Sequence, residues 1–483
     1  MKKILDVTSN PNYGSLKYRN PGLNCIPQIR ANFAANFHNL LPDISYKRVW
    51  SIAYPIILGS VAQNIINVTD TAFLGHVGEV ELGASALGGM FYFVLIMLGL
   101  GFGTGMQIIM SRRFGEGNSH ALGRTFAHGN YFMLPLSLVS FLFMLFLSGP
   151  VLSLLIQSDN IYRASLQFIE YRMFGIFFAY GQVMFRAFYV SISSTRVITW
   201  STVVMAVVNI ILDYGLIFGK LGLPAMGLQG AALASVIAEI TAVIYLTADV
   251  LLRKYHIRYP LFRMGNFDLK LFLQNLKLAY PIMFQNFLSL GVWFAFFLLI
   301  EKLGEQSLAI SNIIRSIYIV FMIPIWGFAS AANSMVSYLI GMRHDELIFV
   351  LIRRIINLTL MGVGLLVMIS LIYPSMLIRL YTNDLTLISG SLPVLYIVMI
   401  GAPFYASGII LFNGVMGTGK TNVSFVIEII TLSLYLIYVF LLVSRFDAGV
   451  VMVWTSEIVY GLVLTSLSLA YLRYGSWKKN LQQ

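Results

Sequence analysis

The chain has 483 residues, of which 58% are hydrophobic and only 11% charged. This composition excludes a water-soluble globular protein, because too few polar side chains remain to cover a wetted surface. The net charge of +12 needs no nucleic-acid partner, since basic residues beside anionic lipid account for it.

Residues 1–45 are polar and contain no apolar core of a signal peptide, so they predict a cytoplasmic tail. Twelve apolar runs follow, each near the roughly 20 residues that a spanning helix needs. Their approximate bounds are 49–74, 84–111, 125–149, 164–190, 197–219, 228–252, 275–300, 307–340, 350–375, 389–415, 422–444 and 449–472. The sequence therefore predicts an all-α integral membrane protein.

Basic residues decide the expected orientation, because Lys and Arg stay mainly on the cytoplasmic side of short loops. Of the 32 Lys and Arg, 24 lie in the tails and even-numbered loops, five in the odd-numbered loops and three within spans. We expect both termini in the cytoplasm and the chain in the cell inner membrane. The expected parts are a tail (1–45), a six-helix lobe (46–255), a linker (256–274), a second six-helix lobe (275–473) and a tail (474–483).

The two expected lobes are repeats of one another. The segment Ala-Tyr-Pro-Ile at 53–56 recurs at 279–282, a shift of 279 − 53 = 226 residues, and the same shift gives 14 identities over positions 53–115. Six spans separate the copies, so both have the same orientation in the membrane. The sequence predicts two pseudo-symmetric bundles around a central cavity.

Acidic side chains within the spans mark the candidate site, because each costs several kcal/mol in lipid unless it faces a cavity or a partner. Asp70 is near the outer end of the first span, and Asp213, with Asn209 one turn earlier, is near the outer end of the fifth. The candidate ion-coupling residues are Asp70, Asp213, Asn209 and Glu239, the last extending a proton path. The candidate cavity residues in this half are Gln63, Asn67 and Ser235. Each acid alone could instead be a helix cap or an interface residue.

The second half does not repeat these acids. The shift places Phe296, Tyr435 and Val439 opposite Asp70, Asn209 and Asp213. Its own acids are Glu428, for which an interface position is at least as good an interpretation as function, and Glu457, which lies deeper. Further candidate cavity residues are Gln285, Asn286 and Asn312. We therefore expect ion coupling in the first half.

Two patterns suggest other chemistry and are set aside. Residues 414–421 match the phosphate-binding pattern G-x-x-x-x-G-K-T. They join two apolar spans and lack the strand and soluble domain that such a loop needs, so we expect no ATP binding. The single Cys25 and the six scattered His residues argue against a cysteine or histidine metal site.

From about 45 to 475 the chain resembles the multidrug and toxic compound extrusion (MATE) family. The segments that carry the resemblance are 53–55, 70–78, 186–196, 209–214, 230–234 and 414–421. The resemblance implies export of organic cations driven by H⁺ or Na⁺. In the DinF-like branch the coupling acids lie on helices 1 and 5 and correspond to Asp70 and Asp213. The NorM-like branch uses acids on helices 7 and 10, where this chain has none, so the DinF-like branch is favoured.

Two alternatives to an antiporter remain open. A lipid-linked oligosaccharide flippase of the same superfamily would need cavity cations, for which Arg186 and Arg315 are available. An intramembrane enzyme would need a Ser/His pair, an Asp pair in opposed helices or His ligands, and the spans contain too few His residues for most such chemistry. We expect no enzyme activity and no cofactor. The expected partners are a small-molecule substrate, H⁺ or Na⁺ (the latter on Asp70 and Asp213) and the bilayer, with the protein a monomer.

Overall fold

A computed structural model gives the fold, and it describes residues 42–262, 267–446, 448–475 and 477. The described residues from 44 onward form one compact unit, and only this unit is considered below. The predicted N-terminal tail up to residue 41 and the end of the chain from residue 478 lie outside the described residues.

The first half consists of seven helices. They are α2 (Tyr46–Val77), α3 (Glu79–Gly115), α4 (Ser119–Leu155), α5 (Asp159–Arg172), α6 (Gly175–Ser191), α7 (Arg196–Phe218) and α8 (Gly227–Leu252). The short α9 (Tyr255–Arg258) leads out of it. Several of these helices start where a polar side chain can accept a hydrogen bond from a free backbone amide. Asn118, for example, accepts from the amide of Ala121 at 2.9 Å.

The second half begins where α10 starts, at a residue that the sequence analysis assigned to the linker. Its elements are α10 (Leu269–Glu301), α11 (Glu305–Gly341), the 3₁₀ turn η2 (Asp345–Leu347), α12 (Ile348–Ile372), α13 (Pro374–Arg379), α14 (Leu385–Gly417), α15 (Thr421–Ser444), α16 (Val450–Trp454) and α17 (Ser456–Tyr474). Helix α10 begins before its apolar run, because Asp268 caps it at the N-terminal end.

Within the described ranges, eleven helices are long and apolar enough to cross a membrane, and the count is twelve if α5 and α6 form one broken span. These two helices meet at an angle of 55°. The prediction of an all-α membrane protein with twelve spans is therefore confirmed. The fourth predicted span, 164–190, is the broken one, and hydropathy does not register the bend.

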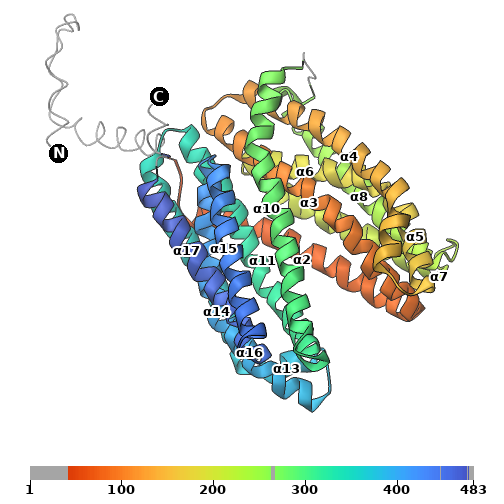
Figure 1. Cartoon of the computed structure of the whole chain (residues 1–483). Helices are drawn as coiled ribbons and strands as arrows, with labels where there is room; N and C mark the ends of the chain where they lie inside the picture. Colours follow the sequence, from red (N-terminus) through yellow and green to blue (C-terminus); the bar gives the residue numbers. More distant parts are fainter. Residues whose placement is uncertain (1–41, 263–266, 447, 476, 478–483) are drawn as a thin grey trace, which may run out of the picture. The chain divides into compact units, whose positions relative to one another are not determined.

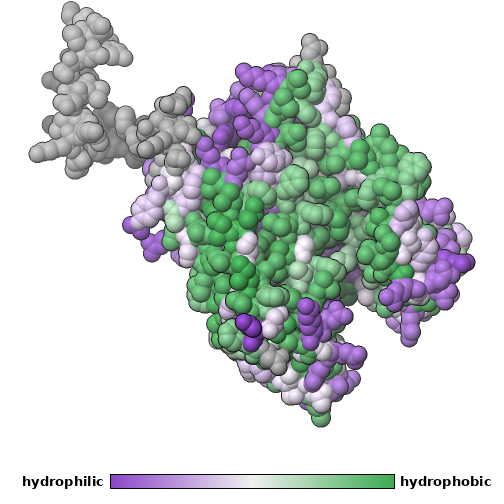
Figure 2. Space-filling view, in the orientation of Figure 1, coloured by the Kyte–Doolittle hydropathy of each residue, from purple (hydrophilic) through white to green (hydrophobic). Residues whose placement is uncertain are grey.

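The two ends of the bundle differ in charge and in packing. We call the end with the connections at 116–118, 192–195, 253–268, 342–347 and 418–420 the basic end, and the other the opposite end. Figure 2 shows an apolar band between hydrophilic ends. In Figure 1 the tips at α13 and α16 lie well apart from those at α5 and α7, and Figure 2 shows a notch between them. The halves are therefore separated at the opposite end.

The halves meet where α3 crosses α11. A methyl group added at Gly115 would collide with the carbonyl oxygen of Tyr338, and one added at Gly341 would collide with that of Arg112. These contacts are repeats of each other, since 115 + 226 = 341 and 112 + 226 = 338. Small residues allow two helix backbones to approach this closely in a membrane.

Serine hydroxyl groups follow the same symmetry one turn further in. The Ser337 hydroxyl donates to the carbonyl of Ile108 at 2.7 Å. In the other copy, Ser111 (111 + 226 = 337) lies 2.8 Å from the Ser334 hydroxyl (108 + 226 = 334). The repeated Gly and Ser residues detected in the sequence are thus the residues that join the two halves.

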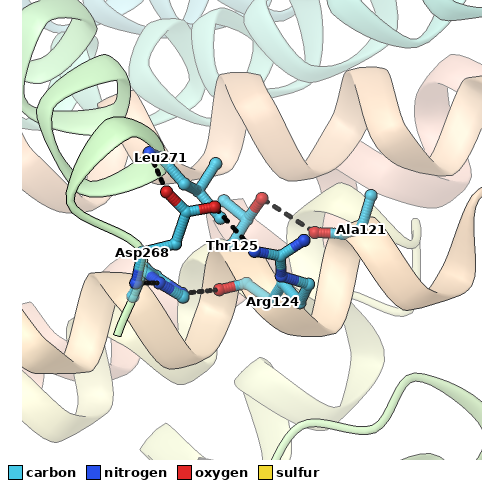
Figure 3. A network of polar contacts seen from close by, with 6 residues as sticks. Ala121, Arg124, Thr125, Asp268 and Leu271 are labelled. Carbon is cyan, nitrogen blue, oxygen red and sulfur yellow. Dashed lines mark hydrogen bonds and ion pairs between the residues drawn. The ribbon is translucent and has the colours of Figure 1, made fainter. Parts of the chain in front are cut away.

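A clamp between α4 and α10 also joins the halves at the basic end. Figure 3 shows Asp268 between Arg124, with which it forms an ion pair at 2.8 Å, and the amide of Leu271, which it caps at 3.1 Å. The Asp268 amide donates to His128 at 3.0 Å. Hydrogen bonding from the Leu271 amide, followed by Arg124, holds the pKa of Asp268 below its ordinary value.

Every direct hydrogen bond between the halves within the described ranges lies in the basic part of the bundle. Their donors and acceptors are residues 44, 46, 107, 108, 111, 112, 124, 128, 190, 268, 330, 334, 337, 354, 357 and 418. The structure is therefore closed at the basic end and open at the opposite one.

Candidate functional site

The first half brings Asp70 and Asp213 together. Asp213 and Asn209, one turn apart on α7, are 0% and 1% exposed, and Asp70 on α2 is partly buried. The carboxyl groups of Asp70 and Asp213 are within hydrogen-bonding reach of each other. Two of the predicted coupling acids, 143 residues apart (213 − 70), thus share one site.

The buried polar atoms of this site have no hydrogen-bond partners. Among the described residues nothing donates to Asp70 Oδ1 or to either Asp213 oxygen, and both amide atoms of Asn209 are without a partner. Buried polar groups are nearly always paired, so such a group of unpaired atoms calls for a proton or a cation between them. The described part of the chain has no cluster of three His, Cys, Asp or Glu side chains suited to a metal ion.

Glu239, the third predicted acid, lies elsewhere and is already paired. Both of its carboxylate oxygens accept from the guanidinium of Arg172, one of them at 2.9 Å, and the Tyr92 hydroxyl donates to it at 3.4 Å. The Arg172 guanidinium also lies 3.8 Å from the centre of the Tyr92 ring. Glu239 therefore has a fixed countercharge, and Arg172 is within electrostatic range of Asp70.

The bend between α5 and α6 positions Arg172. Arg172 is the last residue of α5, and Gly175 begins α6 so close to the ion pair that an added methyl group would meet both Arg172 and Glu239. In the sequence, Arg172 is one of the three basic residues within spans, and no partner was predicted for it. Its place within an apolar run was the only sequence signal for this residue.

The other predicted cavity residues are scattered over the two halves. Gln63 and Asn67 are exposed on α2, and Ser235 is partly buried on α8. In the second half Gln285 is buried, with an unpaired side-chain oxygen, while Asn286 and Asn312 are partly buried. No contact in the described part of the chain joins these six residues into one site, so their assignment to a cavity stays a prediction.

In the second half, aromatic and aliphatic side chains occupy the positions of the first-half site. Phe296 and Tyr435, the repeat equivalents of Asp70 and Asn209, are in ring contact at 5.7 Å. Val439, the equivalent of Asp213, is fully buried. The duplicated helices are thus kept, while their chemistry at this position differs.

The two arginines of the flippase alternative come from different halves. Arg186 is exposed on α6, and Arg315 is exposed on α11 with its guanidinium 5.2 Å from the centre of the Phe297 ring. No contact between them, or with the Asp70 site, is present in the described part of the chain. The acids, and not the arginines, form a shared site.

Twelve apolar spans, an internal repeat and a buried, uncompensated polar site are features of a membrane transporter. A family model described as MatE matches the chain twice, at residues 55–215 and 281–441. The two matches are offset by 281 − 55 = 226 residues, which is the shift found in the sequence. The chain therefore belongs to the MatE family. Because the family's members are transporters, the prediction that it is not an enzyme is confirmed.

Relatives in two other comparisons agree with this assignment. A probable multidrug resistance protein NorM from Thermotoga maritima is 25% identical over 91% of this chain and 94% of its own length. The match to a NorM protein from Agrobacterium fabrum, at 28% identity, covers 60% of this chain and 62% of that protein. A solved transporter of the MOP superfamily from Pyrococcus furiosus has the same fold, with a TM-score of 0.84, 17% identity and coverage of 91% and 98%. The DinF-like branch stays a prediction.

Proposed function

We propose that this protein is a secondary antiporter that exports small organic compounds, often cationic or amphipathic, in exchange for H⁺. The observation that carries the proposal is the contact between Asp70 and Asp213 beside an unpaired Asn209. The related NorM proteins are named as probable multidrug resistance proteins, which supports the substrate class.

The coupling follows from electrostatics. Two carboxyl groups this close together in a largely buried site repel when both are ionised, so the pair retains a proton or a cation. A cationic substrate competes for the same charge, so release of the proton and binding of the substrate are linked. Each charge that crosses 100 mV supplies about 2.3 kcal/mol, enough to drive such an exchange. Na⁺ on Asp70 and Asp213 is the alternative coupling ion.

Arg172 and Glu239 have a different role in this proposal. Glu239 is ion-paired with Arg172, so in this proposal it holds Arg172 in place and is not part of the proton path. The fixed positive charge of Arg172 lies within electrostatic range of Asp70, next to the proposed ion site. This replaces the proton path through Glu239 that the sequence suggested.

The proposed orientation makes the structure an outward-open state. The basic end, closed in the structure, carries the Lys- and Arg-rich loops and would face the cytoplasm, with both termini on that side of the inner membrane. Reporter fusions at the C-terminus test the orientation. Activity of a reporter that works only outside the cytoplasm would contradict it.

Transport in liposomes tests the coupling. Wild-type protein with an imposed pH gradient should exchange ethidium, an organic cation, for protons, while Asp70→Asn and Asp213→Asn should lose gradient-driven exchange. Glu301→Gln, which changes an exposed acid at the opposite end, is the control and should transport normally. Exchange by Asp70→Asn at the wild-type rate would refute the proposal. A flippase would instead depend on Arg186, and a Na⁺ gradient would drive exchange if Na⁺ is the coupling ion.

A further inference from the structure

The second half buries its two acids in contacts between α15 and α17. Glu457 on α17 accepts a hydrogen bond from Tyr435 on α15 at 3.0 Å. Glu428 on α15 accepts one from Tyr460 on α17 at 3.1 Å. The rings of Tyr435 and Tyr460 are in edge-to-face contact at 6.0 Å. We call these four residues the acid–tyrosine ladder, because each helix supplies one acid and one tyrosine.

Hydroxyl groups from two other helices complete the ladder. Tyr318 on α11 donates to Glu457 at 2.6 Å, and Ser289 on α10 donates to Glu428 at 2.8 Å. Glu457 and Glu428 are only 7% and 3% exposed. Burial this deep contradicts an interface position for Glu428, which the sequence analysis considered.

Within the described part of the chain, no basic side chain pairs with the acids of the ladder. The groups that face its acids are hydroxyl donors from α10, α11, α15 and α17, together with Tyr405 of α14, whose ring is stacked on that of Tyr460 at 5.7 Å. Arg315, the nearest basic residue along α11, is exposed over the Phe297 ring. The second oxygen of Glu428, Oε2, has no donor at all.

The first half contains a related arrangement that does have a countercharge. Tyr92 and Tyr318 are repeat equivalents (92 + 226 = 318), and each donates to a glutamate on the last span of its own half, Glu239 or Glu457. The sites differ in charge because Glu239 also binds Arg172.

Glycine and arginine positions around these glutamates show the same relation. Gly175 and Gly401 are equivalents (175 + 226 = 401), and a methyl group at Gly401 would lie 3.9 Å from Cβ of Glu457, as one at Gly175 would meet Glu239. The equivalent of Arg172 is Val398 (172 + 226 = 398), which is buried. Glu457 therefore occupies a counterpart of the Glu239 site from which the countercharge is missing.

We propose that the acid–tyrosine ladder is a second proton-binding site, with Glu457 as the group that takes up and releases the proton. An ionised carboxylate buried without a cation is strongly unfavourable, whereas the protonated form keeps both tyrosine contacts. The tyrosine rings around these acids are packed together. A proton, unlike a larger ligand, needs no additional volume to bind there. Proton binding at Glu457 goes beyond the proposed function, and only its use in transport rests on that function.

The position of Glu457 suggests how the site acts. Its hydrogen bonds join α11, α15 and α17, and α14 lies beside it, since a methyl group added at Gly401 would be 3.9 Å from its Cβ. Loss of the proton would leave a negative charge among these four helices, which favours a state in which water or a cation reaches it. The ladder thereby links proton release to a rearrangement of the second half, which lacks the Asp70 site.

Infrared difference spectroscopy of the purified full-length protein tests the proposal, because a protonated carboxyl group has a carbonyl band that a carboxylate lacks. On a pH jump, wild type should show a band that Glu457→Gln loses. Glu428→Gln and Glu239→Gln should keep this same band. Asp70→Asn should keep it too, even with transport abolished, so failure of the proposed function is separable from failure of this one.

The outcome that overturns the proposal is a spectrum of Glu457→Gln with every carboxyl band of the wild type. Loss of the assigned band in Glu239→Gln instead would also overturn it. If Glu457→Gln does not fold, Tyr318→Phe and Tyr435→Phe replace it. Each removes one donor to the Glu457 carboxyl group, so each should shift the frequency of the band without abolishing it. An unshifted band in both variants refutes the assignment.

Discussion

The crossing of α3 and α11 gives the sharpest prediction about conformation. Gly115→Ala and Gly341→Ala each place a methyl group against the backbone of the other helix, where no flexible side chain can move aside. Overpacking of this kind costs about 1–3 kcal/mol. The cost applies only to the state that is closed at the basic end. Each substitution should therefore shift the equilibrium about 5- to 150-fold toward the state in which that end opens.

Distance measurements between spin labels at the opposite end provide the assay. Leu154 and Leu380, which are 86% and 72% exposed, are suitable label sites once the single Cys25 is replaced by serine. The long label-to-label distance should lose population to a shorter one in both variants. Gly89→Ala is the matched control on α3, because its methyl group would have no neighbour within 4 Å. A shift no larger than that of Gly89→Ala would refute the reasoning.

Three further predictions concern charges. Arg172→Met should destabilise the protein by about 3–5 kcal/mol, because it leaves the largely buried Glu239 without its countercharge. The double variant Arg172→Met/Glu239→Gln should cost less. Arg163→Met in an exposed pair on α5 should cost under about 1 kcal/mol in the same thermal unfolding assay. Asp268 has a lowered pKa, so its contribution is present above about pH 4, the ordinary value, and is lost as pH falls through the lowered value. Asp268→Asn should remove this acid dependence of the unfolding temperature. Lys420→Ala should leave proton-driven exchange intact, and an ATP affinity that this variant loses would contradict the membrane interpretation of residues 414–421.

The sequence alone was enough to predict the spans and the repeat, because both depend on local patterns of hydropathy and on residue identity at one fixed shift. It also paired Asp70 with Asp213, through a resemblance and their similar depth. It could not find the partner of Glu239, since Arg172 is 67 residues away and comes into reach only through the bend at the end of α5. Nor could it show that Glu428 is buried, because the residues covering it come from three other parts of the chain.

The positions that the two halves still share are those that the fold requires twice. A crossing of two equivalent helices puts the same demand on both copies, so Gly115 and Gly341 must both be small. A charge has no such partner constraint. One copy can hold Glu239 against Arg172 while the other keeps Glu457 with tyrosines alone, since the energy of each site depends only on its own neighbours. A duplicated transporter can therefore keep a symmetric crossing of α3 and α11 while its halves bind protons differently. The retained tyrosines Tyr92 and Tyr318 mark where that difference arose.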